Sequence, residues 1–138
     1  TLFILKLNKV YIWDRFVSQK MILEDLEVYK IALDMGKLAW DIYNELPKEH
    51  KYTQGSQFLE AADSVGANIA EGYGRYHYKD SLKFYYNSRG SLFELKHWIT
   101  LFEIRDLAKN EKSKKMKCLI ETEQLKLNNF INSIKTRI

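Results

Sequence analysis

The chain has 138 residues, of which 46% are hydrophobic, enough for one hydrophobic core but too few for two. One proline and six glycines are too few for a fold of short strands and tight turns, whereas the abundant Leu, Lys, Glu and Ala favour helices. The composition therefore predicts a single all-α domain.

The cysteine content and the apolar segments bear on the compartment. Cys118 is the only cysteine and cannot form a disulfide within the chain, so we expect a reducing, cytoplasmic environment. The apolar segment 2–13 contains Lys6 and Lys9 and is followed by no small-residue cleavage site, so it makes a poor signal peptide and a poor membrane span. We expect no membrane partner.

The formal charge of +4 is unevenly distributed. Residues 21–50 hold seven acidic and three basic residues, whereas residues 105–138 hold nine basic and four acidic ones. This polarity could steer an anion to one end of the molecule, but it equally suits acidic and basic helices side by side in a bundle or ring. The net charge is modest for a dedicated nucleic-acid-binding protein, which favours the second interpretation.

Residues 1–20 are predicted to form an N-terminal arm ahead of a bundle domain at 21–138. Met21 and the residues that follow it resemble a natural start, so the arm is either sequence from outside the native protein or a native extension. Its large apolar side chains predict packing against its own bundle or a neighbouring chain.

The first predicted helix begins near Asp25 as N-cap and ends near Leu46, before Pro47. It carries two apolar stripes at helical spacing, which together are too wide for one antiparallel partner. We therefore expect one side to lie in a bundle core and the other in a contact between subunits. The stripes are Leu26, Tyr29, Leu33, Gly36, Trp40 and Tyr43, and Val28, Ala32, Met35, Ala39, Ile42 and Leu46.

Three further helices follow. The second is capped by Thr53 or Ser56 and ends at Gly72, and its small residues predict a close approach to a neighbour. The third follows Asp80 and runs to about Leu107, and the fourth is capped by Asn110. Four helices with short connections predict an antiparallel, up-and-down four-helix bundle.

Polar residues interrupt the second and third helices where apolar ones would pack. Antiparallel pairing across the turn would place Glu71 level with Arg89, and we predict a buried ion pair between them that fixes the register. A ligand pocket is the alternative interpretation of this polar network. Its members are Asn68, Glu71, Arg89, Ser91 and Glu94.

The turn between these helices mixes tyrosines with basic residues. Aromatic rings stack on bases and cations bind phosphates, so this composition suits single-stranded nucleic acid, although an interface between bundle ends would use the same residues. The start of the fourth helix adds a cluster of lysines, which are either solvated or bind a partner molecule. The candidate contacts are Arg75, Tyr76, His77, Lys79, Lys83, Lys112, Lys114, Lys115 and Lys117.

Catalytic and metal signatures are incomplete. Glu94 and His97 form one Glu-x-x-His pair, but a carboxylate-bridged metal site in a bundle needs a second copy. The three histidines lie far apart in sequence, and the glycines of EGYGR follow no strand and precede no GK[ST]. We expect no catalytic residues, no metal and no cofactor.

Three segments carry a family resemblance: LEDLEVYK at 23–30, NIAEGYGR at 68–75 and RGSLFEL at 89–95. Over residues 21–136 the chain resembles the bacterial four-helix bundle family first noticed as open reading frames in intervening sequences of large-subunit ribosomal RNA genes. The resemblance implies an up-and-down bundle that assembles as rings, often pentamers, with a poorly defined role. The accessory protein of diversity-generating retroelements, which binds nucleic acid and a reverse transcriptase, is a more distant likeness.

These observations predict a non-catalytic, oligomeric interaction or scaffold module, with RNA or single-stranded DNA as its ligand. The alternative is an adaptor that binds another protein and no nucleic acid.

Overall fold

The computed structural model describes residues 22–108 and 110–138, so the predictions on residues 1–20 lie outside the described residues. Every regular element in these two ranges is helical, which confirms the all-α prediction. The elements are the 3-10 turn η1 (Leu23–Asp25), α2 (Glu27–Glu45), the single-turn α3 (Lys48–Lys51), α4 (Gln54–Tyr73), α5 (Tyr78–Ile104) and α6 (Glu111–Lys135).

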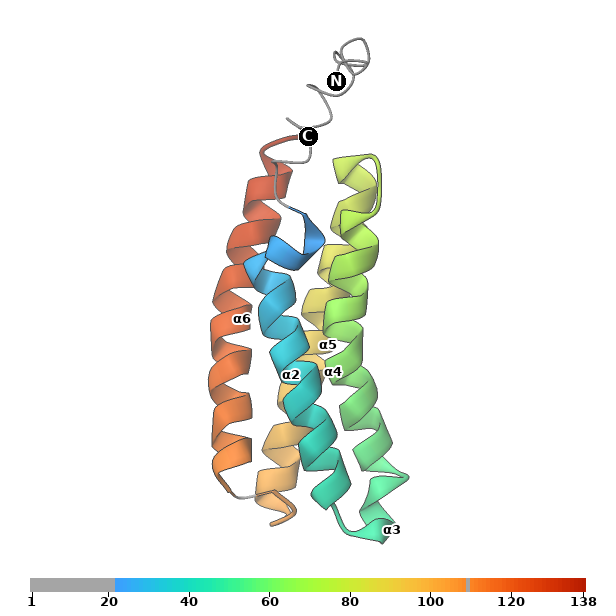
Figure 1. The fold of residues 1–138 in the computed structure, drawn as a ribbon, viewed down its shortest axis with the longest axis vertical. Coiled ribbons are helices and arrows are strands. Elements are labelled where there is room, and N and C mark those ends of the chain that lie inside the picture. The colour runs from blue at the N-terminus through green and yellow to red at the C-terminus, as the bar shows by residue number, and fades with distance from the viewer. Residues whose placement is uncertain (1–21, 109) are drawn as a thin grey trace, which may run out of the picture.

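The four long helices run alternately down and up and form an antiparallel bundle (Figure 1). α4 packs against both α2 and α5, and α6 packs against the same two helices from the other side. α2 therefore lies diagonally across the core from α5. The predicted up-and-down four-helix bundle is confirmed.

Two predicted helix starts were wrong by a few residues. Asp25 lies in η1, and the N-cap of α2 is Leu26, which makes no side-chain capping bond. α5 begins at Tyr78, so Asp80 lies in its first turn, where a negative charge suits the helix dipole. The prediction for α6 is confirmed, because the Asn110 side chain accepts a hydrogen bond from the Ser113 backbone N–H at 3.1 Å.

The core draws on all four helices. Met35 of α2, Phe58 of α4, Phe102 of α5 and Leu127 of α6 are fully buried. The rings of Phe58 and Phe102 pack at 5.1 Å between centroids, in a tilted arrangement. Burial of these side chains is the main favourable term in folding the bundle.

Glycine allows α4 and α5 to approach closely near the turn that joins them. A Cβ placed on Gly72 would lie 2.6 Å from Cε1 of Tyr85 and 3.1 Å from the Ser81 carbonyl oxygen. The Tyr85 ring cannot easily move away, because it is buried and packs edge-on against Phe130 at 4.9 Å. The small-residue end of α4 is thus needed for the packing of α5.

We expect Gly72→Ala to destabilise the protein by about 1–3 kcal/mol, because the added methyl overpacks a rigid contact. Gly90→Ala is the matched control: Gly90 lies inside α5, and a methyl added there would have open space for 4 Å around it, so alanine should stabilise by about 0.5–1 kcal/mol through helix propensity. Urea denaturation of both variants checks this, and equal effects of the two substitutions would contradict it.

Candidate interaction surfaces

The predicted buried pair between Glu71 and Arg89 does not form. Glu71 is exposed and accepts a hydrogen bond from Arg75 one turn away on the chain, at 3.0 Å. Arg89 instead donates to the side-chain oxygen of Asn128 on α6 at 3.1 Å and lies over the Tyr86 ring at 5.0 Å. The prediction was wrong because Glu71 lies on the solvated outer face of α4, whereas the half-buried Arg89 lies on the side of α5 that faces α6.

The other members of the predicted polar network also bond elsewhere. The Asn68 side chain donates to the Ser64 carbonyl of its own helix at 2.9 Å. Glu94 is exposed and accepts from the Trp98 indole N–H at 3.2 Å, while Ser91 is half-buried. No shared network, and hence no polar ligand pocket, joins these residues within the described parts of the chain.

Sequence reasoning missed four buried polar side chains, Ser81, Ser88, Ser113 and Glu123, and two of them bear on the packing of the helices. The Ser88 hydroxyl donates to the Val65 carbonyl at 2.7 Å and ties α5 to α4. Glu123 is fully buried on α6, and neither of its carboxyl oxygens has a hydrogen-bond partner in the described structure. Its place between Ile120 and Leu127 on the apolar stripe of α6 was the available signal.

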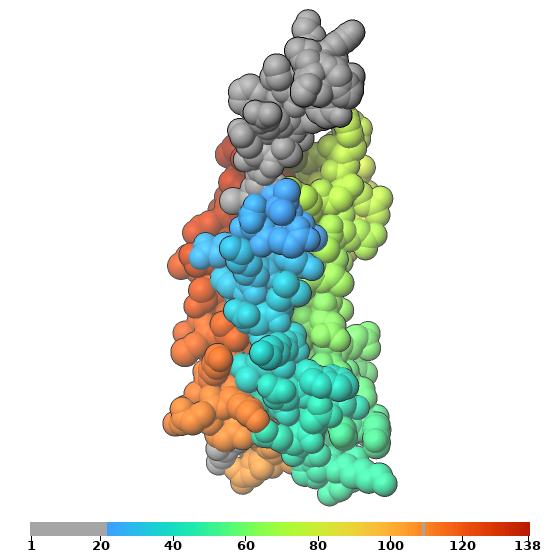
Figure 2. All heavy atoms as spheres, in the orientation of Figure 1, coloured from blue at the N-terminus to red at the C-terminus, as the bar shows by residue number. Residues whose placement is uncertain are grey.

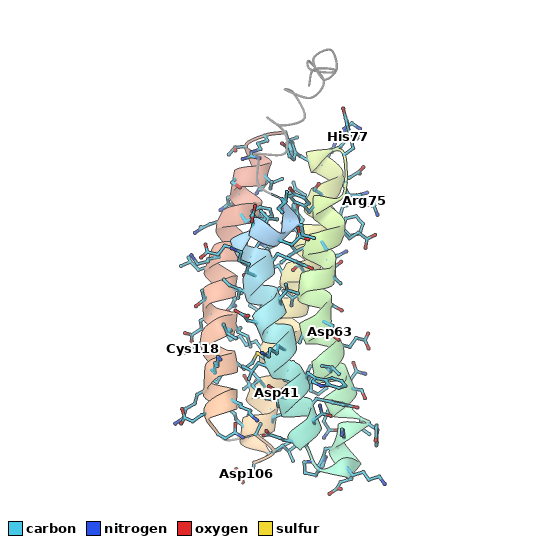
Figure 3. All side chains as sticks on the ribbon, in the orientation of Figure 1. Asp41, Asp63, Arg75, His77, Asp106 and Cys118 are labelled. Atoms are coloured by element: carbon cyan, nitrogen blue, oxygen red, sulfur yellow. The ribbon has the colours of Figure 1, made fainter. Side chains whose placement is uncertain are left out.

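The predicted basic and aromatic residues of the turn do gather at one end of the bundle. We call this the turn surface, comprising Tyr73, Arg75, Tyr76, His77, Tyr78, Lys79 and Lys83. Figure 3 shows Arg75 and His77 where α4 meets α5. Tyr76 is 92% exposed and packs edge-on against His77 at 4.8 Å. An aromatic ring so far out in water is available to a ligand.

Cations at this end lie over aromatic rings. The Arg75 guanidinium is 4.5 Å from the centre of the Phe84 ring, and Arg137 at the chain's C-terminal end is 5.7 Å from that of Tyr78. Lys79 and Lys83 are exposed and form no ion pair with another described residue. These groups place positive charge and π-faces together in water.

The lysines at the start of α6 lie at the opposite end of the bundle (Figure 1). Lys112 pairs with Glu45, Lys114 with Glu111 at 3.4 Å, and Lys117 with Glu103 at 3.1 Å. The hydrogen bond to Glu45 raises the pKa of Lys112. Lys115 is exposed. The two candidate basic clusters therefore cannot form one continuous site, and three of the four α6 lysines already have acidic partners.

The two apolar stripes of α2 differ in their exposure to solvent. The stripe that contains Met35 lies in the core, whereas Leu33 and Trp40 of the other stripe are 53% and 54% exposed. Trp40 stacks on Tyr43 at 5.9 Å. Figure 2 shows α2 along the visible face, between α6 and α4. We call Tyr29, Leu33, Gly36, Trp40 and Tyr43 the α2 surface.

A groove of about 410 Å³ runs beside this surface, between α2 and α4. Its walls are mostly apolar and include Tyr29, Leu33 and Ala67, with Lys37 and Asp63 as charged groups. Partial burial raises the pKa of the Asp63 carboxyl. A second hollow of about 320 Å³ shares Asp63 and Ala67 and extends toward Tyr43. The apolar surface of α2 thus continues across the groove onto α4.

Metal-binding groups are dispersed in the described residues. No group of three or more His, Cys, Asp or Glu side chains lies close enough there to hold a metal ion. His97 of the Glu-x-x-His pair packs edge-on against Trp98 at 4.9 Å. Among the helices described, none is long and apolar enough to cross a membrane.

Because Glu71 is exposed and Arg89 is half-buried at the edge of the α5–α6 contact, we expect Glu71→Ala to lower stability by less than about 0.5 kcal/mol and Arg89→Ala by about 1 kcal/mol. Leu92→Ala, at a fully buried position on the same helix as Arg89, should cost about 2–5 kcal/mol. Chemical denaturation separates the two classes. A loss of stability as large as that of Leu92→Ala in either charge variant would instead favour the buried ion pair between Glu71 and Arg89.

Comparison with known proteins relates this chain to a solved structure and to a protein family. The fold is similar to that in the crystal structure of a protein with unknown function from the S23 ribosomal protein family of Bacteroides thetaiotaomicron. The two structures superpose with a TM-score of 0.70 at 18% sequence identity, over 75% of this chain and 97% of that one. At that identity the likeness shows the fold alone. No curated protein matches the chain significantly. The sequence model for the 23S rRNA-intervening sequence protein family matches residues 24–129, most of the chain, and the chain therefore belongs to that family.

Proposed function

We propose that this chain is a non-catalytic scaffold that assembles with copies of itself through the α2 surface and presents the turn surface to single-stranded nucleic acid. The observation that carries the proposal is the half-exposed pair Leu33 and Trp40 on α2. Large apolar side chains grouped on one helix beside an apolar groove are typical of a protein contact.

A second copy is the occupant we favour for the α2 surface. α5 lies diagonally across the core and carries its own exposed aromatic residues, Tyr86 and Phe93, two turns apart. Two different apolar surfaces on opposite sides of one molecule allow a head-to-tail contact between copies, and a contact of this kind closes into a ring when the rotation permits. The five-membered ring implied by the family resemblance has this symmetry.

The turn surface supports the choice of nucleic acid as ligand. Single strands are held by stacking of bases on aromatic rings and by cations along the phosphates, and Tyr76, Lys79 and Lys83 present both in water. The acidic residues Glu24 and Asp25 of η1 lie toward the same end of the bundle and would repel phosphates, so we limit the proposed contact to the turn surface. The family name refers to intervening sequences of 23S rRNA and names no ligand, so the choice of RNA or single-stranded DNA rests on the turn surface alone.

Self-association is tested with Trp40→Lys and Leu33→Lys. We expect the wild type to be oligomeric at micromolar concentration and each variant to be mostly monomeric, because a lysine at the centre of an apolar contact costs about 2 kcal/mol or more, which is roughly 30-fold in affinity. Sedimentation velocity measures the mass of each species. Leu125→Lys, at a 64% exposed position on α6, is the matched control and should leave the mass unchanged. A monomeric wild type would contradict the proposal.

Nucleic-acid binding is tested by fluorescence anisotropy with a labelled single-stranded RNA of about 20 nucleotides. Tyr76→Ala should weaken binding by about 5- to 100-fold through lost stacking. The double variant Lys79→Ala/Lys83→Ala should reduce the dependence of log K on log salt by about one to two units. Lys115→Ala, at the opposite end of the bundle, is the control and should bind as the wild type does.

Absence of RNA and single-stranded DNA binding by the wild type even at low salt would remove the nucleic-acid part of the proposal. The protein adaptor would then be the better interpretation of the turn surface, since tyrosines with exposed hydroxyls also suit protein contacts.

A further inference from the structure

Glu123 is an exception among the charged residues that the structure describes. It lies on the inward face of α6 between Ile120 and Leu127, and it is fully buried, as both of these neighbours essentially are. Neither carboxyl oxygen has a hydrogen-bond partner among the described residues. A buried polar group without a partner is costly, and a buried charge without one costs far more. Its retention in the core therefore calls for a physical reason.

Contacts on either side of Glu123 fix its level in the bundle. Lys126 pairs with Glu27 at 3.1 Å and Lys112 pairs with Glu45, which together set the register between α6 and α2. The Arg89 to Asn128 hydrogen bond does the same between α6 and α5. By interpolation between these contacts along the helices, Glu123 lies level with the buried turns that contain Ala32 of α2 and Leu92 of α5. The carboxyl therefore lies at the interface of α6 with two helices.

The charged groups around this position offer no compensation. From α2, Glu27 acts on Glu123 with a like charge, and its own ion pair with Lys126 occupies the nearest lysine of α6. On α5, Arg89 binds Asn128 and Glu103 binds Ser113 and Lys117, while Lys96, seven residues from each of them along the helix, is exposed and donates no hydrogen bond to Glu123. From α4, across the core, the inward residues at this level are Ala62 and Val65.

We propose that Glu123 is a proton-operated lock on α6: tight packing of α6 against α2 and α5 requires the protonated carboxyl, and loss of the proton loosens α6. A neutral acid can remain in the apolar interface at moderate cost, whereas a carboxylate must reach water, and it can do so only if α6 moves outward or turns. Arg137 lies over Tyr78, so movement of α6 would also disturb the turn surface.

The direction of the pH dependence follows from the position of the carboxyl. Burial, and to a smaller extent the charge of Glu27, raises the pKa of Glu123 from its ordinary value of 4.5 to about 8. Between these values the folded state holds a proton that the unfolded state has lost, so stability falls as pH rises. One proton corresponds to about a tenfold change in the unfolding equilibrium constant per pH unit. The loss levels off above a pH of about 8.

The experiment compares wild type with Glu123→Gln, an uncharged side chain of the same shape. Unfolding equilibria are measured with urea from about pH 5.5 to about pH 9, at one protein concentration, because oligomerisation makes stability concentration-dependent. The other titrating groups are common to both proteins and cancel in the ratio. We expect the wild type to lose up to about a hundredfold more in equilibrium constant than Glu123→Gln between about pH 6 and about pH 8. Parallel pH profiles would overturn the proposal.

A second variant and a local measurement separate the lock from a general effect. Glu123→Met suits the apolar surroundings and should fold with a pH profile as flat as that of Glu123→Gln, which keeps the comparison possible if the amide itself is poorly tolerated. Hydrogen exchange followed by mass spectrometry, with wild type and Glu123→Gln both at about pH 8.5, should show faster exchange of α6 in the wild type and little difference in α4. Equal loss of protection in all four helices would contradict a lock on α6.

Discussion

The structure depends on a geometric constraint: a helix in a four-helix bundle can turn only one face toward the core. α2 has apolar residues on more than one face, and the bundle buries the stripe around Met35 while leaving Leu33 and Trp40 half-exposed. Each of the other three long helices already packs against two neighbours, so no described element remains to cover the outer side of α2. The contact with a second copy that we propose would remove that surface from water.

Specific polar contacts fix the register of the helices without adding much stability. Ser88 binds the Val65 carbonyl inside the core, whereas Arg89 and Lys126 reach across helix pairs at the surface, where each contact contributes little. Among the charged residues that the structure describes, Glu123 alone is buried in the core. The bundle thus combines an apolar interior that sets its stability with one internal acid that makes the packing of α6 sensitive to protons.

Most of the fold could be predicted from sequence, because apolar periodicity decides which face of a helix is buried. The four long helices and the Asn110 cap followed from local signals that tertiary packing left unchanged. The Glu71 to Arg89 pair failed because level along the bundle says nothing about rotation about the helix axis, and a one-turn pair with Arg75 was available. Composition alone also grouped the basic residues of the turn with the lysines at the start of α6. The 25 residues of α6 separate these two clusters by about 37 Å, at about 1.5 Å per residue.

The exposure of Trp40 in the assembled protein tests the central claim most directly. In the variant Trp13→Phe/Trp98→Phe, Trp40 is the only tryptophan that remains, and its half-exposed ring in the single subunit should be quenched readily by iodide. If copies of the chain cover the α2 surface, the Trp40 emission will be blue-shifted and protected from iodide at micromolar concentration, and the protection will disappear on dilution. Quenching that is efficient and independent of concentration would show that this surface stays in water, and would contradict assembly through α2.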